Sequence, residues 1–237
     1  MDTLRRRHSS AQKKAVSVII PALNEEATIR QVILAARAHP MVSEVIVVDD
    51  GSTDATARLA EKAGARVLSI LENRGKGEAM AAGADVAKND LLIFLDADLI
   101  GLQTSMITVL IDSLRSGEYD MFTLIRERTM DPLPFIPDSL IIGGERAVTR
   151  SLWNLIPAEE RQGFDVELAL NFYAKKLGLK TGAQYMPGLD QVIKEKKYGF
   201  FRGFSERIKM VLSCLRAYFK LHVLGFMTET LENMERR

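Results

Sequence analysis

Apolar runs and amphipathic segments alternate along the first hundred residues. The apolar runs cover residues 15–20, 44–50, 65–71 and 91–96, and the segments with helical spacing cover 25–38, 53–64 and 76–88. The runs lack a regular apolar–polar alternation, which is typical of strands covered on both faces. Strands that alternate with helices at this spacing predict an α/β fold, with a mostly parallel, doubly wound sheet and helices on both faces.

The boundaries of the predicted elements follow from single residues. Pro21 is expected to stop the first strand, and Asn24 is a plausible N-cap of the helix that follows. Gly64 is expected to end the second helix. The first helix should bury one apolar face, formed by Ile29, Val32, Ile33 and Ala36.

Polar residues follow three of the predicted strands, at 21–26, 49–52 and 96–98. The carboxyl ends of parallel strands meet at one edge of a doubly wound sheet, where such folds bind their ligands. One acidic strand end could be a helix cap, but three at one edge predict a binding site.

Composition narrows the class of protein. The 237 residues include 32 basic and 31 acidic side chains, 47% apolar residues and one cysteine, Cys214. This excludes a disordered chain, a polytopic membrane protein and an intrachain disulfide, and it gives no overall basic footprint for nucleic acid. The single cysteine fits a reducing compartment and no apolar window has the length of a membrane span, so we expect a cytoplasmic protein, with peripheral contact to the inner face of the membrane as the alternative. The basic, polar residues 1–14 are expected to be a disordered tail.

Three common nucleotide and hydrolase motifs are absent. No G-x-G-x-x-G follows the first strand, and no G-x-S-x-G is present. Gly75-Lys76-Gly77 lacks the Ser or Thr that a P-loop requires.

Asp96 and Asp98 carry the strongest chemical signal. Carboxylate oxygens suit a hard divalent cation, and Mg²⁺ usually combines one or two carboxylates with substrate phosphates. The alternative is that both acids cap the next helix. Lys76, flanked by glycines, could approach a phosphate, or it could simply be a solvated lysine in a turn.

Four segments in order, at 16–29, 45–56, 73–83 and 91–99, resemble family 2-type glycosyltransferases with the GT-A fold. The likeness includes polyprenyl-phosphate sugar synthases and glucosyl-3-phosphoglycerate synthase-like enzymes. It implies a nucleotide-diphosphate-sugar donor, with UDP-glucose the commonest choice, and a Mg²⁺ or Mn²⁺ cofactor. By position it implies that the donor-binding residues are Pro21, Ala22, Leu23, Glu25, Asp50 (with Asp49 as the competing choice), Lys76, Asp96, Ala97 and Asp98.

Of these donor-site residues, Asp96 and Asp98 would bind the metal. Metal-dependent relatives often add a His after the helix at 163–178, but residues 187–192 contain none. Gln191 or Asp190 could take its place through oxygen.

The second half resembles the acceptor-binding part of the same domain. After a strand at 119–127 and a loop at 127–138, Gly143–Arg146 resembles a small loop before a helix that relatives use near the acceptor. Gly144 and Arg146 would bind a phosphorylated acceptor, because a helix start and an arginine both favour anions. The alternative is a plain turn with Arg146 in a surface ion pair.

Asp165 and Glu167 open the predicted helix at 163–178. The resemblance implies a catalytic carboxylate at this point, where a base would take the proton of an acceptor hydroxyl. Asp165 is preferred for that role and Glu167 is second. Favourable charges at a helix N-terminus would also explain both acids.

Residues 15–198 are expected to form the GT-A domain and 199–237 a helical extension. Residues 194–220 hold eight basic and two acidic side chains. The same segment has an apolar stripe of Phe201, Phe204, Ile208, Val211, Leu212, Leu215, Tyr218 and Phe219. A basic amphipathic helix at 200–222 could contact an anionic membrane surface, but packing in a homodimer or on the domain is favoured.

Two other functions stay open at this point. One is a nucleotide-sugar-binding protein without turnover. The other is a phosphotransferase with Asp96 as nucleophile, since Asp96–Leu99 resembles part of a haloacid-dehalogenase-type motif.

Overall fold

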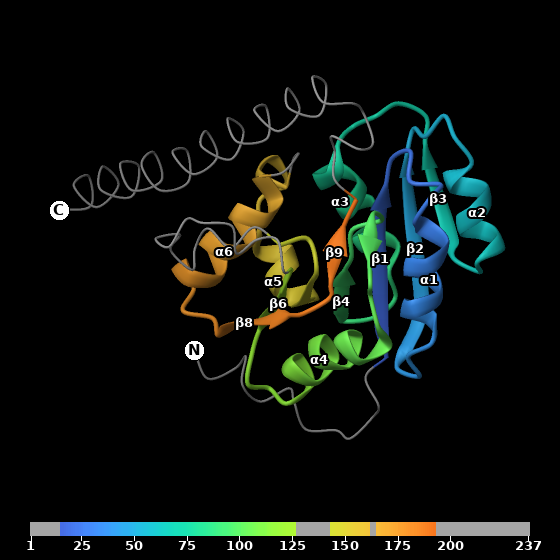
Figure 1. Cartoon of the computed structure of the whole chain (residues 1–237). Coiled ribbons are helices and arrows are strands. Elements are labelled where there is room, and N and C mark those ends of the chain that lie inside the picture. Colours follow the sequence, from blue (N-terminus) through green and yellow to red (C-terminus); the bar gives the residue numbers. More distant parts are fainter. Residues whose placement is uncertain (1–14, 127–142, 162–164, 193–237) are drawn as a thin grey trace.

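The computed structural model describes residues 15–126, 143–161 and 165–192 (Figure 1). Seven strands form one sheet in the order β3-β2-β1-β4-β7-β6-β8. Their bounds are β1 Val16–Ala22, β2 Val42–Asp50, β3 Arg66–Ile70, β4 Leu91–Phe94, β6 Met121–Arg126, β7 Arg146–Thr149 and β8 Thr181–Met186. Two short strands, β5 (Leu99–Ile100) and β9 (Asp190–Gln191), pair separately.

Within this described sheet, β7 is the one strand that runs antiparallel to its neighbours. The helices are α1 Ile29–Arg37, α2 Thr56–Lys62, α3 Lys76–Val86, α4 Thr104–Arg115, α5 Arg150–Leu155 and α6 Asp165–Lys176, with a 3₁₀ turn at Ala158–Glu160. The predicted α/β class, the mostly parallel sheet and the helices on both faces are confirmed.

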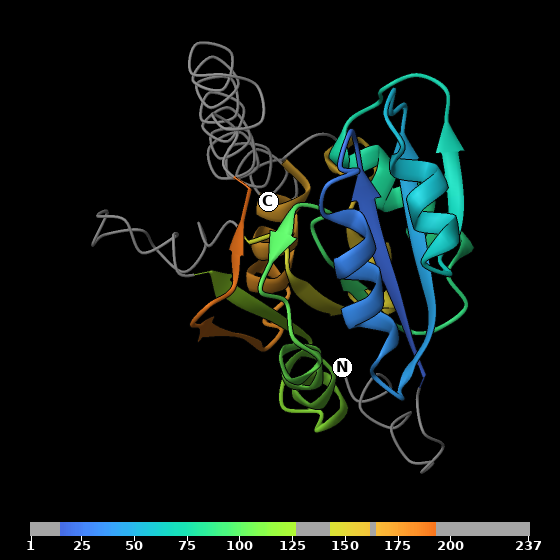
Figure 2. The same ribbon diagram turned by 45° about the vertical axis from the view of Figure 1, so that its right-hand side comes forward.

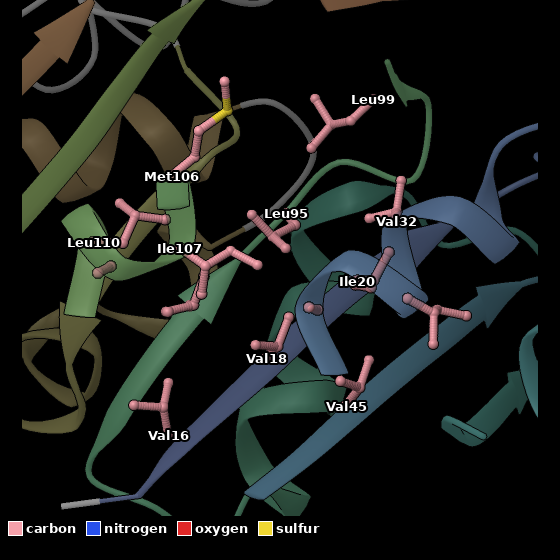
Figure 3. Packing of buried hydrophobic residues seen from close by; sticks show 14 of the residues in the cluster. Val16, Val18, Ile20, Val32, Val45, Leu95, Leu99, Met106, Ile107 and Leu110 are labelled. Carbon is pink, nitrogen blue, oxygen red and sulfur yellow. The ribbon is translucent and has the colours of Figure 1, made fainter. Parts of the chain in front are cut away.

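Successive residues of β1 supply the two halves of the core. Val18 and Ile20 belong to one buried cluster, together with side chains of α1, α2 and α4. Figure 3 shows this cluster, with Ile107 of α4 near Leu95 and Val32 of α1 near Ile20. Ile19 belongs to a second cluster with side chains of α3, α5 and α6. The strand is therefore buried on both faces, which explains its unbroken apolar sequence.

The two helix layers are visible in Figure 2, where α1 and α2 cover one side of β1 and β2. On the opposite side, α3 packs very closely on the sheet. A side chain at Gly83 of α3 would collide with Ile19. The small residues of α3 therefore bring the helix, and Lys76 at its start, close to the strand ends.

Two predicted boundaries were wrong. Pro21 lies inside β1 rather than after it. The pairing of β1 with β4 ends at Ile19, so Pro21 has a strand neighbour on one side only and its missing N–H costs little.

Asn24 is also not the cap of α1, which begins after Thr28 without a side-chain cap. Asn24 has a left-handed backbone (φ 54°), and its Oδ1 accepts a hydrogen bond from Thr53 N at 2.8 Å. A tertiary contact has replaced the local cap that the sequence suggested. The predicted buried face of α1 and the stop at Gly64 (φ 86°) are confirmed.

Several expectations fall outside the described residues. They are the N-terminal tail 1–14, the loop expected at 127–138 and the extension 199–237, with its membrane or homodimer contact through 200–222. Across the described ranges, no helix combines the length and hydropathy that a membrane crossing needs.

Candidate active site

The polar strand ends lie at the point where the chain order in the sheet reverses. From β1 the chain continues outward to β2 and β3 on one side, whereas β4 lies on the other side of β1. Ligands of doubly wound sheets bind at such a switch point, beyond the carboxyl ends of the strands. Asp50 ends β2 and Asp96 follows β4 across this point.

The loops after β1 and β2 are bound to each other by hydrogen bonds. Ser52 Oγ accepts from Asn24 N at 2.8 Å, and Thr56 Oγ1 accepts from Glu25 N at 2.7 Å. Glu26 Oε2 accepts from Ala55 N at 3.0 Å. The predicted donor-site residues Pro21, Ala22, Leu23 and Glu25 thus lie on a braced edge, in which Ala22 is buried and the others are half-buried.

Asp50 braces the loop that precedes α3. Its two carboxylate oxygens accept from Arg74 N and Gly75 N, both at 2.8 Å. Gly75 adopts φ 92°, a left-handed conformation that favours glycine, and α3 begins at the next residue. Asp49 Oδ1 accepts from Ser52 N at 3.2 Å. A contact of either aspartate with a nucleobase stays a prediction.

Lys76 joins the end of β4 to α6. Its Nζ lies 2.7 Å from Asp96 Oδ1 and 2.6 Å from Glu167 Oε1. Burial alone would raise the pKa of Asp96, but the charges of Lys76 and Arg126 outweigh burial and lower it to about 2. Asp96 is therefore an anion at neutral pH, held between two cations.

Arg126, at the end of β6, is a site residue that the sequence did not reveal. Its Nη1 lies 3.3 Å from Asp96 Oδ2, 3.2 Å from Glu145 Oε1 and 2.5 Å from Gln191 Oε1. The one available signal was a basic residue at the carboxyl end of a predicted strand. The pairing of β5 with β9 places Gln191 opposite Leu99, so the structure brings the predicted ligand Gln191 next to Asp98.

Gly144 lies against the carboxylate of Asp96, and Glu145 shares Arg126 with that carboxylate. A side chain at Gly144 would collide with the carboxylate of Asp96, so the close approach of this loop requires glycine. Glu145 is fully buried, and its Oε2 has no hydrogen-bond partner. Burial raises the pKa of Glu145 to about 8, although the nearby Arg126 opposes that shift.

The structure corrects the setting predicted for Arg146. It is the first residue of β7, and the helix begins only at Arg150, so Arg146 is not at a helix start. It is also fully buried, which excludes a surface ion pair. Its Nη2 donates to Gly143 O at 2.6 Å and its Nη1 to Glu167 O at 3.3 Å. Arg146 thus holds the loop to α6, and direct acceptor binding stays a prediction.

Of the two candidate catalytic carboxylates, the structure describes the side chain of Glu167 but not that of Asp165. Asp165 begins α6, but its side chain lies outside the described residues. The Glu167 side chain is 3% exposed and shares Lys76 with Asp96. The structure therefore brings Glu167 into the charged cluster, and the order of preference between the two stays untested.

Because the pKa of the buried Glu145 is raised, we expect the stability of the chain to depend on pH. Its pKa in the folded chain is above the ordinary 4.5, so folding favours the protonated acid. The contribution of Glu145 to the free energy of unfolding is complete below about pH 4.5. It falls by roughly 1.4 kcal/mol per pH unit as the pH rises toward about 8. Glu145→Gln cannot ionise, so its melting temperature should rise relative to wild type as the pH increases from 5 to 8. A difference that stays constant over this range in thermal scans would contradict the assignment.

A doubly wound sheet with acidic strand ends at its switch point defines an α/β fold with a ligand site at that edge of the sheet. The chain belongs to glycosyl transferase family 2, whose sequence model matches residues 17–173.

Named relatives are similar to parts of the chain. A glucosyl-3-phosphoglycerate synthase of Mycobacterium tuberculosis is 39% identical over 114 residues, which are 44% of this chain and 35% of that protein. An undecaprenyl-phosphate 4-deoxy-4-formamido-L-arabinose transferase of Pseudomonas paraeruginosa is 36% identical over 126 residues, 49% of this chain and 37% of that protein. The chain thus spans little more than a third of the length of either curated relative.

The fold is similar to solved structures over most of the chain. The crystal structure of the M. tuberculosis glucosyl-3-phosphoglycerate synthase with Mn²⁺, UDP-glucose and phosphoglyceric acid has a TM-score of 0.72 and 27% identity. The match covers 87% of this chain and 79% of that one. This agreement confirms the GT-A-like fold expected from the resemblance.

Proposed function

We propose that this chain is a metal-dependent glycosyltransferase that moves a sugar from a UDP-sugar, such as UDP-glucose, to a phosphorylated acceptor. The observation that carries the proposal is the position of Asp96 and Asp98. They follow the central strand β4, beside Gln191 and across the switch point from Asp50. A relative with this fold binds Mn²⁺ and UDP-glucose together in a crystal.

In this proposal the braced loops after β1 and β2 bind the nucleoside. Pro21, Ala22, Leu23 and Glu25 form one wall, and Asp50 (or Asp49) contacts the base. Because these loops are bound to each other and to the start of α3, they need little ordering when the donor binds.

The residues beside β4 fit a hard divalent cation. Asp96 is ionised, and Asp98 and Gln191 add carboxylate and amide oxygens of the kind that Mg²⁺ prefers. Within the described ranges, no three His, Cys, Asp or Glu residues gather as a metal cluster, so we assign the remaining ligands to the donor diphosphate. When bound, the cation would neutralise the charge of the departing nucleoside diphosphate.

The acceptor side of the site is assigned to the loop before β7, where Gly144 approaches the carboxylate of Asp96. In this proposal Gly144 and Arg146 bind a phosphorylated acceptor, such as a phosphoglycerate or a polyprenyl phosphate. A relative with this fold binds phosphoglyceric acid in a crystal. If the acceptor group is a hydroxyl, a base is needed, and Asp165 is our first choice with Glu167 second. If the acceptor group is a phosphate, no base is needed.

The test is nucleotide release from a panel of nucleotide sugars with Mn²⁺, each with and without candidate acceptors. We expect UDP release from a UDP-hexose that depends on a phosphorylated acceptor. Donor binding without release for any acceptor in the panel would instead support the nucleotide-sugar-binding protein without turnover. The aspartate-nucleophile alternative is disfavoured, because the chain belongs to glycosyl transferase family 2.

A further inference from the structure

Three side-chain oxygens from distant segments converge on one nitrogen atom. Asp96 follows β4, Glu145 precedes β7 and Gln191 lies in β9, yet each places an oxygen 2.5–3.3 Å from Arg126 Nη1. A guanidinium nitrogen of this type carries two hydrogens, so it cannot give three oxygens a full hydrogen bond each. Oxygens arranged in this way surround a point of positive charge, as the ligands of a metal ion do.

The setting of these oxygens makes a positive centre necessary. Glu145 is fully buried, and the side chains of Arg126 and Asp96 are 11% and 16% exposed. Asp96 carries a negative charge, and the other two oxygens present their negative dipole ends to the same point. Without Arg126, Lys76 would still balance Asp96 Oδ1, but Asp96 Oδ2, Glu145 Oε1 and Gln191 Oε1 would lose the cation that they share, in an environment that water hardly reaches.

Asp96 and Gln191 are also two of the three residues that the proposed function assigns to the metal. For that assignment this inference rests on the proposed function. We propose that the Arg126 guanidinium takes the place of the divalent cation in the donor-free protein and competes with it for the oxygens of Asp96 and Gln191. Both cations cannot hold the same oxygens at once, so a divalent ion must displace Arg126 from them.

The donor supplies what displaces the arginine. A diphosphate brings acceptor oxygens that pair well with a guanidinium, often through two parallel hydrogen bonds. It also brings the negative charge that a divalent ion requires. Arg126 therefore suppresses binding of the cation alone and couples it to binding of the nucleotide.

The experiment measures Mn²⁺ binding without nucleotide, from the signal of free Mn²⁺ in electron paramagnetic resonance. Arg126→Gln removes the competing charge and keeps the three oxygens. Its Kd for Mn²⁺ alone should be at least about tenfold lower than that of wild type. Arg74→Gln is the matched control, since it removes an exposed arginine near the same strand ends and should change this Kd by less than about twofold. Equal Kd values for Arg126→Gln and wild type would overturn the proposal.

A titration of the unmodified chain keeps the proposal falsifiable if Arg126→Gln fails to fold. Wild type should bind Mn²⁺ at least about tenfold more weakly without UDP than with it, and a ratio below about threefold would contradict the competition. The outcomes also separate this inference from the proposed function. Tighter Mn²⁺ binding in Arg126→Gln with no turnover of any UDP-sugar by wild type would contradict the proposed function but support this inference. Turnover by wild type, with no higher affinity of Arg126→Gln for Mn²⁺, would contradict this inference but leave the proposed function standing.

Discussion

Asp98→Ala should abolish sugar transfer and leave the fold intact. Asp98 is half-buried in the turn between β4 and β5, where its side chain contributes little to the core. Its carbonyl oxygen accepts from Val192 N at 3.1 Å, a contact that the substitution keeps. Loss of a group that stabilises charge in the transition state typically lowers kcat by roughly 10²–10³-fold.

The measurement is UDP release with saturating Mn²⁺, together with a thermal scan of each variant. Asp112→Ala is the control, since Asp112 is an exposed acid on α4 and its removal should leave the rate unchanged. A rate above a tenth of wild type in Asp98→Ala would show that this carboxylate does not hold the cation.

Lys76→Met should destabilise the chain by roughly 3–5 kcal/mol, as expected when one partner of a buried ion pair is removed. The Lys76 side chain is 18% exposed and that of Glu167 only 3%, and the two lie 2.6 Å apart. Without the lysine, the carboxylates of Glu167 and Asp96 would face each other with no cation between them. The measurement is the free energy of unfolding in urea.

Two further variants make this result specific. Lys62→Met removes an exposed lysine of α2 and should change the unfolding free energy by less than about 0.5 kcal/mol. Adding Glu167→Gln to Lys76→Met removes the orphaned charge and should restore part of the lost stability. If the two substitutions were simply additive, the pair would not be coupled in the fold.

The pattern of apolar and polar residues within short segments was enough to predict most of the fold. The buried face of α1, the strands after Gly64 and before Asp96, and the layers on both faces follow from periodicity along short segments. The same holds for the strand-end residues Asp50 and Asp96, because topology alone places the carboxyl ends of parallel strands together.

What the sequence did not reveal depends on contacts between distant segments. Arg126 matters because the pairing of β6, β7 and β4 carries the end of β6 to Asp96, some thirty residues away along the chain. The sequence around Arg146 predicted a loop before a helix. In the structure Arg146 instead lies opposite Phe94 in the sheet and is buried there. Asn24 likewise exchanged a local cap for a bond to the loop after β2. No single-segment pattern encodes such partners.

The central claim is that the strand-end carboxylates hold a metal and a nucleotide diphosphate together. Calorimetric titration of UDP into the wild-type chain, once with Mn²⁺ and once with EDTA, tests it most directly. We expect UDP to bind at least about tenfold more tightly with Mn²⁺ and the advantage to vanish in Asp98→Ala. Equal UDP affinity with Mn²⁺ and with EDTA in wild type would contradict the claim.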